Sequence, residues 1–310
     1  MFNLPEKHLT YNQDVFLRAK YNITVTKAWE GISFSSLNAW LNNFDNDDPL
    51  QLFFAHRVLD NLIYRSRDQF VTLLKTMLNI SLPSLLAEKL SISITNANDL
   101  IYGRTNNHKL FFVPTTSSYD ITASSPYLAR ELAIHLKVDE DSFVRFDDVS
   151  KYVNDKNVIL VFIDDICSTG SQFCRSVSKK LFTHLSTKKC KVFYTPLALH
   201  EMGRDRLVDD CLTPKLIDGF TSVEWLDNTY NCFSEKSRFS KWSKNSHGKN
   251  LSKFYLDFLN QNIPDMYNNE DEKLGYGKLS LLYSFYYRAP NNSLPVIWTN
   301  DNNWSPLIKR

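Results

Sequence analysis

The sequence has few cysteines, and none of them forms the close pairs that metal and redox sites use. Five cysteines occur among 310 residues, an odd number without any Cys-x-x-Cys spacing. A disulfide framework normally needs an even set, and a thiolate metal site needs close pairs. The pattern therefore favours buried or incidental thiols in a reducing compartment, the cytoplasm.

The chain also lacks an excess of charge of either sign. It carries 36 basic and 34 acidic residues, a formal net charge of +2. A domain that binds nucleic acid over much of its surface is usually strongly basic. Composition therefore argues against a general nucleic-acid surface and leaves only a local basic patch open.

From the sequence pattern we expect neither a leader peptide nor a membrane span. The opening residues, Met-Phe-Asn-Leu-Pro-Glu-Lys, contain no apolar h-region. No apolar run approaches the roughly 18 residues that a membrane span needs. Internal repeats and low-complexity segments are absent as well. We therefore expect a soluble, cytoplasmic protein without a membrane partner.

The chain does have enough apolar residues for a large packed core. Hydrophobic residues make up 43% and aromatic residues 14% of the sequence. A chain of this length forms one large domain or two small ones. We predict a helical N-terminal region (residues 1–95), an α/β core (96–230) and a C-terminal region that forms a hood (231–310).

Helix start signals recur in the N-terminal region. Asp48 followed by Pro49 is typical of an N-cap and a first helical residue. Ser66 caps a second predicted helix, and Pro83 opens a third. Amphipathic helices ahead of a sheet either cap the core or dock a partner, and the sequence leaves both open.

Alternating strand and helix patterns in the core predict an α/β fold with a mostly parallel sheet. Apolar runs predict strands at residues 110–113, 158–163 and 191–198, with a short one near 220–226. Ser125 and the proline after it start a helix that follows the first strand.

One stretch carries most of the functional information. The strand at 158–163 stops at two adjacent carboxylates, Asp164 and Asp165, and a loop of small residues leads into an amphipathic helix. Loop and first-turn N–H groups can bind a phosphate, and carboxylates at a strand end can accept hydrogen bonds from vicinal ribose hydroxyls. A generic turn with a solvated acidic pair is the alternative, but unpaired buried carboxylates are costly.

This arrangement resembles the PRPP loop of the type I phosphoribosyltransferases. The resemblance implies that Asp164 and Asp165 are catalytic and hold the 2′ and 3′ hydroxyls of the ribose. Purine-salvage members carry an aspartate base where this chain has a serine, at position 168, so purine salvage is disfavoured. The residues that would hold the 5′-phosphate are Ser168, Thr169, Gly170, Ser171 and Gln172.

The loop after the first predicted strand has two open interpretations. In the resembled fold this loop holds pyrophosphate through its backbone N–H groups. An ordinary polar turn explains the segment equally well, because the glycine and the basic residue often seen there are missing. The residues of this candidate pyrophosphate loop are Thr115, Thr116, Ser117 and Ser118.

The C-terminal region contains two turn motifs, Leu274-Gly-Tyr-Gly and Pro290-Asn-Asn-Ser-Leu-Pro, with a predicted aromatic helix around 281–286 between them. Asparagines between prolines predict a rigid turn with amide groups for hydrogen bonding. Aromatic side chains nearby can stack a base. We predict a base site at Tyr276, Asn291 and Asn292; a lid that only packs its tryptophans is the alternative.

Across residues 35–310 the order of these motifs is similar to that of phosphoribosyltransferase-like proteins of bacterial conflict systems, including those beside retron reverse transcriptases. Gln172, unusual among salvage enzymes, fits this branch. The resemblance implies a type I phosphoribosyltransferase-like fold with an N-terminal helical cap. It also implies a role in anti-phage defence, as the toxic effector of a retron.

Three functions follow from the motifs and the resemblance. An enzyme would act at the anomeric carbon of PRPP or of a nucleotide, as a phosphoribosyltransferase or a nucleotide glycosidase, with Mg²⁺ bound through the ligand. A non-catalytic sensor would read a nucleotide in the same pocket. A scaffold would dock on a reverse transcriptase or on its nucleic acid through the helical N-terminal region. The partners that the resemblance implies are a retron reverse transcriptase with its DNA, or a second accessory protein.

Overall fold

The described part of the chain forms two compact units in this computed structural model. Met1–Phe70 and Asp227–Arg310 form the terminal unit, and Val71–Leu226 form the α/β unit. This grouping differs from the three predicted regions, which stay a prediction. The structure describes residues 4–92, 94, 97–105, 108–116, 124–237, 239, 248–263, 270–300 and 304–309.

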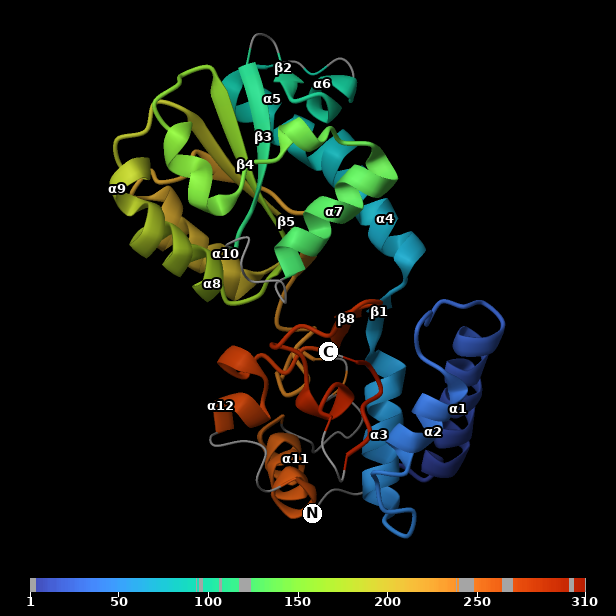
Figure 1. Ribbon diagram of the computed structural model, residues 1–310. Helices are drawn as coiled ribbons and strands as arrows, with labels where there is room; N and C mark the ends of the chain where they lie inside the picture. Colours follow the sequence, from blue (N-terminus) through green and yellow to red (C-terminus); the bar gives the residue numbers. More distant parts are fainter. Residues whose placement is uncertain are drawn as a thin grey trace. The chain divides into compact units, whose positions relative to one another are not determined.

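The α/β unit is built on a mostly parallel mixed sheet (Figure 1). The strand order is β2-β3-β4-β5-β6, with β7 paired to the C-terminal end of β5. Only the β2–β3 pair is antiparallel among these described strands. The predicted parallel sheet is therefore confirmed. The bounds are β2 Arg104–Thr105, β3 His108–Pro114, β4 Val158–Cys167, β5 Lys191–His200, β6 Gly219–Phe220 and β7 Glu224–Leu226.

Strand β4 lies between β3 and β5 and is buried on both faces. Val158, Leu160 and Phe162 share one hydrophobic cluster with Phe173 and Val177 of the following helix. The residues that alternate with them along the strand are also buried. A strand buried on both faces is a continuous apolar run, and that run is what made this strand predictable.

Helices cover both faces of this sheet (Figure 1). The face that carries Leu160 and Phe162 packs against the helices that begin at Ser171 and Glu201. Helix α7 packs on β3 and β4. The bounds are α5 Leu82–Leu90, α6 Asn98–Ile101, α7 Ser124–Leu136, α8 Ser171–Arg175, α9 Phe182–Leu185 and α10 Glu201–Leu207.

The second and third predicted N-terminal helices are one continuous helix, which corrects the prediction. Helix α4 (Arg67–Thr76) runs into α5 through a π turn at Met77–Ser81. The Leu82 N–H donates to the Met77 carbonyl, five residues back. Pro83, which has no N–H to donate, follows this wider turn, where the register of helical hydrogen bonds changes.

This continuous helix, Arg67–Leu90, is long and apolar enough to cross a membrane by length and composition alone. Leu74, Leu82 and Leu86 of this helix are fully buried, and 39% of its most apolar window is buried inside the protein. The core helix of a soluble protein meets the same criteria. Packing therefore accounts for part of the apolar character of this helix.

Capping explains where two of the predicted helices begin. Asp48 accepts a hydrogen bond at 2.9 Å from the Leu50 N–H, and Pro49 is the first residue of α3 (Pro49–Asn61). Ser66 and Gln69 exchange side-chain-to-backbone hydrogen bonds at the start of α4, a capping box. Both predicted caps are confirmed.

The terminal unit combines helices from both ends of the chain with one short parallel strand pair (Figure 1). Strand β8 lies where an aromatic helix was predicted, so that prediction was wrong. It pairs with β1, and Tyr283 lies opposite Ile63. The bounds are α1 His8–Thr24, α2 Phe34–Leu41, α3 Pro49–Asn61, β1 Ile63–Arg65, α11 Gly248–Asn262, α12 Glu270–Lys273 and β8 Tyr283–Phe285.

Aromatic residues from both ends of the chain hold the terminal unit together. The indole N–H groups of Trp40 and Trp304 both donate to the Val296 carbonyl, at 2.6 and 3.1 Å. The rings of Phe44 and Phe258 stack with centroids 5.2 Å apart. Trp304 therefore has a packing role, as the alternative interpretation of the C-terminal region expects.

Candidate functional site

The acidic pair lies inside strand β4, not beyond its end as predicted. Asp164 is opposite Pro196 of β5, and the ladder continues to Cys167. The strand extends past the carboxylates because β5 supplies a parallel partner as far as His200. Burial is nearly complete, with 5% of Asp164 and 3% of Asp165 exposed.

Hydrogen bonds from β4 itself and from two segments distant in sequence hold Asp164 in place. Thr115, after β3, donates to Asp164 Oδ2 at 2.8 Å, and Ser124, at the start of α7, donates to Oδ1 at 3.3 Å. The Asp165 backbone N–H also donates to Asp164 Oδ1, at 3.0 Å. Ser124 was not singled out from the sequence, because only the fold brings the start of α7 to the end of β4.

Burial, followed by repulsion from the Asp165 carboxylate, raises the pKa of Asp164 well above its usual range. Two adjacent carboxylates in a dry environment disfavour a second negative charge. Hydroxyl donors or a cation from a ligand would relieve this cost. The site is therefore suited to a ligand that offers vicinal hydroxyls or carries a metal ion.

The loop of small residues turns directly from β4 into a helix. Gly170 has φ +71°, in the left-handed region that favours glycine. The Cys174 N–H then donates to the Gly170 carbonyl at 2.9 Å, which starts the helix. That helix runs without a break over residues 171–185, with a π turn at Ser176–Leu181 between α8 and α9. The predicted order of strand, loop and helix is confirmed.

Ser168 stands out within this loop. Its side chain is 4% exposed, and its hydroxyl has no hydrogen-bond partner among the residues that the structure describes. A buried hydroxyl without a partner is destabilising by about 1–3 kcal/mol. A ligand oxygen at the loop would supply the missing partner.

Helix α10 contributes two residues that sequence reasoning missed. A Cβ added to Gly203 would lie 2.7 Å from the Cys167 carbonyl oxygen and 2.9 Å from that of Ser168. Glycine thus lets α10 approach the loop backbone. Arg206, one turn further along, donates from Nη1 to Ser171 Oγ. A glycine soon after a strand hints at close packing, but no sequence signal pointed to Arg206.

Cysteine chemistry has no evident part in this site. All five cysteines are buried and free. Burial raises the pKa of the Cys167 thiol, at the end of β4, so that it stays protonated and is a poor nucleophile. Within the described residues, no cluster of three or more His, Cys, Asp or Glu side chains is placed to hold a metal ion.

The predicted pyrophosphate loop is described only in its first half. Thr115 is fully buried and bonded to Asp164, and the Thr116 hydroxyl lies 3.0 Å from that of Ser125. These two residues therefore lie beside the acidic pair. Ser117 and Ser118 lie outside the described residues, and pyrophosphate binding stays a prediction.

The three residues of the predicted base site lie together in the terminal unit. The Asn292 side-chain amide donates a hydrogen bond to the Tyr276 carbonyl oxygen at 2.7 Å. The Tyr276 N–H donates to the Asn291 carbonyl oxygen at 2.9 Å. Asn292 is buried and Tyr276 is 44% exposed. Asn292 thus ties the two turn motifs to each other, and its role toward a base stays a prediction.

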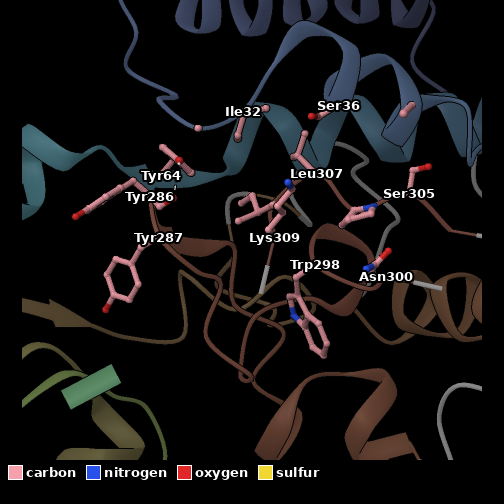
Figure 2. Close-up of a pocket in the computed structure, with 14 residues that line it drawn as sticks. Ile32, Ser36, Tyr64, Tyr286, Tyr287, Trp298, Asn300, Ser305, Leu307 and Lys309 are labelled. Carbon is pink, nitrogen blue, oxygen red and sulfur yellow. Dashed lines mark hydrogen bonds between the residues drawn. The ribbon is translucent and has the colours of Figure 1, made fainter. Parts of the chain in front are cut away.

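The terminal unit also contains a cavity of about 740 Å³ that the sequence did not reveal. Figure 2 shows Tyr64, Tyr286 and Tyr287 on one side of it and Asn300 and Ser305 on the other. None of the predicted site residues lines this cavity.

A parallel sheet with a buried carboxylate pair on its central strand, followed by a small-residue loop and a helix, is the arrangement of a phosphoribosyltransferase-like protein. The comparison with family models agrees, since residues 37–310 match the model named PRTase-CE. The chain therefore belongs to the PRTase-CE family, the phosphoribosyltransferase family of conflict systems. Membership implies a phosphoribosyltransferase-like function in such systems. No curated protein and no solved structure matches the chain.

Proposed function

We propose that this protein binds a ribose 5-phosphate compound, PRPP or a nucleotide, and acts at its anomeric carbon in anti-phage defence. One combination supports this most directly: the two buried carboxylates stand next to a loop whose Ser168 hydroxyl lacks a partner among the described residues. Two adjacent buried charges, and a buried hydroxyl without a partner, each carry a cost that a ligand would offset. A ribose 5-phosphate brings hydroxyl donors for the carboxylates and acceptor oxygens for the loop.

The proposed chemistry needs positioning and charge stabilisation more than a protein nucleophile. Asp164 and Asp165 would accept hydrogen bonds from the ribose hydroxyls and stabilise the positive charge that develops at the anomeric carbon. Thr115 and Ser124, which donate to Asp164, would keep that carboxylate oriented.

Magnesium has a place in this proposal as part of the bound ligand. The described side chains around Asp164 and Asp165 offer carboxylate and hydroxyl oxygens, the donor type that magnesium prefers. Bound with the ligand, it would neutralise the pyrophosphate charge. Thr115 and Thr116 would lie on the pyrophosphate side.

The remaining parts of the proposal concern the rest of the chain and the cell. The N-terminal helices would form a cap, and residues 274–310 a hood that carries the base site. The protein would act in the cytoplasm as the toxic effector of a retron. Its partners would be the reverse transcriptase with its DNA, or a second accessory protein.

A non-catalytic nucleotide sensor, or a scaffold that docks on the reverse transcriptase, is the second candidate, and one observation favours the sensor. Ser168 stands where purine-salvage members carry a catalytic aspartate, and a serine hydroxyl is not a base unaided. The sensor would use the same pocket to bind a nucleotide and would pass the signal to a partner.

A double substitution, Asp164→Asn with Asp165→Asn, separates these candidates. The protein is incubated with PRPP and with a panel of nucleotides in the presence of Mg²⁺, and base or pyrophosphate release is followed. An enzyme should lose turnover by orders of magnitude even at saturating ligand, because the charge that stabilises the transition state is gone. Folding should survive, since asparagine keeps the shape of each side chain and the change removes two adjacent buried charges.

The matched control is Glu140→Gln with Asp141→Asn, which removes two adjacent carboxylates from an exposed turn of the same unit. A sensor should lose mainly affinity in the acidic-pair variant, and excess ligand should restore its output in cells. Wild-type turnover, growth toxicity and phage protection in the acidic-pair variant would refute the proposal. The N-terminal helices would then be the place to look for a scaffold.

A further inference from the structure

We propose that Arg206 is a further phosphate-binding residue, so that a 5′-phosphate is held between helix α10 and the loop at 168–171. This inference rests on the proposed function, because it concerns the ligand of the same loop. Arg206 lies outside every motif of the sequence, and it follows Ser171 by 35 residues along the chain.

Helix α10 packs against the loop backbone at very close distance. A Cβ on Gly203 would lie only 2.7 Å from the Cys167 carbonyl oxygen and 3.0 Å from the Cys167 sulfur. Real Cβ atoms do not approach backbone oxygens so closely. The glycine therefore sets the distance between α10 and the loop, and with it the position of Arg206.

Arg206 contacts the loop through its side chain and the following helix, α8, through its backbone. A Cβ on Gly170 would lie 3.3 Å from Arg206 Cβ and 3.4 Å from its Cδ, so the stem runs alongside the turn. The guanidinium donates from Nη1 to Ser171 Oγ. The Arg206 carbonyl oxygen lies 3.8 Å from the Cys174 sulfur. The charged group is thus held at the start of the helix that follows the loop.

The hydrogen bonds at Ser171 leave a donor available for a ligand. Its oxygen accepts from Arg206 and, at 3.1 Å, from the Thr169 hydroxyl. A hydroxyl has two lone pairs and one hydrogen, so the capacity that remains is that of a donor. The buried Ser168 hydroxyl, without a partner among the described residues, is a second donor. A hydroxyl donor beside the guanidinium at Ser171, with a second hydroxyl donor in the same loop at Ser168, suits an anion with several acceptor oxygens, a phosphate.

The charge of Arg206 is only weakly engaged by the protein. Its Nε lies 3.8 Å from Asp210 Oδ2, and both side chains are about half exposed, at 45% and 52%. An exposed ion pair of this kind contributes little. A phosphate dianion at the loop would therefore compete well for the guanidinium.

The test uses ribose 5-phosphate as the probe and the full-length chain with Arg206→Gln and Arg206→Lys. Loss of a charge-assisted hydrogen bond should weaken binding of ribose 5-phosphate about tenfold or more in Arg206→Gln. Arg206→Lys should retain part of the affinity, because it keeps the charge but not the planar fork. The control is Arg204→Gln on the same helix, whose guanidinium is bonded to Asp205 at 2.8 Å; its affinity should match that of wild type.

Salt dependence separates a ligand contact from a merely structural role. Added NaCl screens a partly exposed charge, so wild-type affinity should fall with salt more steeply than that of Arg206→Gln. A residue that only holds α10 in place would lower thermal stability without changing this slope. That result would overturn the inference.

The inference and the proposed function fail in different ways. If wild type binds ribose 5-phosphate and Arg206→Gln binds it equally well, the inference is wrong and the proposed function stands. If wild type does not bind ribose 5-phosphate, AMP or PRPP at all, the proposed function itself is wrong.

Discussion

Substitution of a single glycine, Gly203→Ala, should both destabilise the α/β unit and weaken ligand binding. Gly203 lies in helix α10, where alanine is normally the better residue by about 1 kcal/mol. Here the added Cβ would lie 2.7 Å from one carbonyl oxygen and 2.9 Å from another, those of Cys167 and Ser168. Both oxygens belong to backbone that leads into the loop, so neither can rotate aside.

The expected magnitude follows from this overlap. Ordinary contacts begin near 3.4 Å, so α10 and the loop must separate by several tenths of an ångström. Overpacking of this kind is destabilising by about 1–3 kcal/mol, which exceeds the gain in helix propensity. We expect a net loss of about 1–2 kcal/mol in the free energy of unfolding. Because Arg206 moves with α10, binding of ribose 5-phosphate should weaken as well.

Urea unfolding measures the loss of stability, and calorimetric titration of ribose 5-phosphate measures the loss of binding. The matched control is Gly219→Ala in β6, where the new Cβ would meet only flexible side-chain atoms, Leu85 Cδ1 at 3.3 Å and Lys89 carbons at 3.5 Å. That variant should stay within about 0.5 kcal/mol of wild type. A Gly203→Ala protein as stable as wild type, or more stable, would show that α10 and the loop can accept the added methyl group without separating.

Two further predictions concern the acidic pair and the C-terminal turns. The pKa of the Asp164 carboxyl is raised above its ordinary value of 3.8, so the folded state binds a proton at this carboxyl more tightly than the unfolded state does. The free energy of unfolding should therefore fall as the pH rises from about 3.8 through the raised pKa. Asp164→Asn should remove this loss of stability with rising pH. If the melting temperatures of wild type and Asp164→Asn change in parallel with pH over that window, the prediction is wrong. Gly275→Ala should lose about 1–3 kcal/mol, because Gly275 has φ +76° and its Cβ would lie 2.8 Å from the Asn292 carbonyl oxygen. If the Tyr276 amide is as well protected from hydrogen exchange in Gly275→Ala as in wild type, the close contact between Gly275 and Asn292 does not hold the two turns together.

The central strand, the acidic pair and the loop were predictable because their signals are local. A buried parallel strand is a continuous apolar run, and the residues that follow it in sequence also follow it in space. The same holds for the caps at Asp48 and Ser66, whose partners lie within three residues. Short-range patterns of this kind survive in the folded protein because nothing distant competes with them.

Features that depend on distant partners were not predictable. Strand β8 has three residues and pairs with β1, which lies some 220 positions earlier; its aromatic pattern alone reads equally well as a helix. Strand β4 extends past Asp164 only because β5 continues beside it. Arg206 reaches Ser171 only because Gly203 lets α10 approach the loop. Each depends on tertiary contacts that no single segment encodes.

The most direct test of the account is calorimetric titration of ribose 5-phosphate into wild type and Gly170→Val. Gly170 has φ +71°, and a Cβ there would lie 3.1 Å from the Gly203 carbonyl oxygen. A β-branched residue would therefore distort the turn on which the phosphate is expected to sit. We predict that wild type and the Gly219→Ala control bind and that folded Gly170→Val shows no measurable binding. Equal affinity of Gly170→Val and wild type would contradict the assignment of this loop to phosphate.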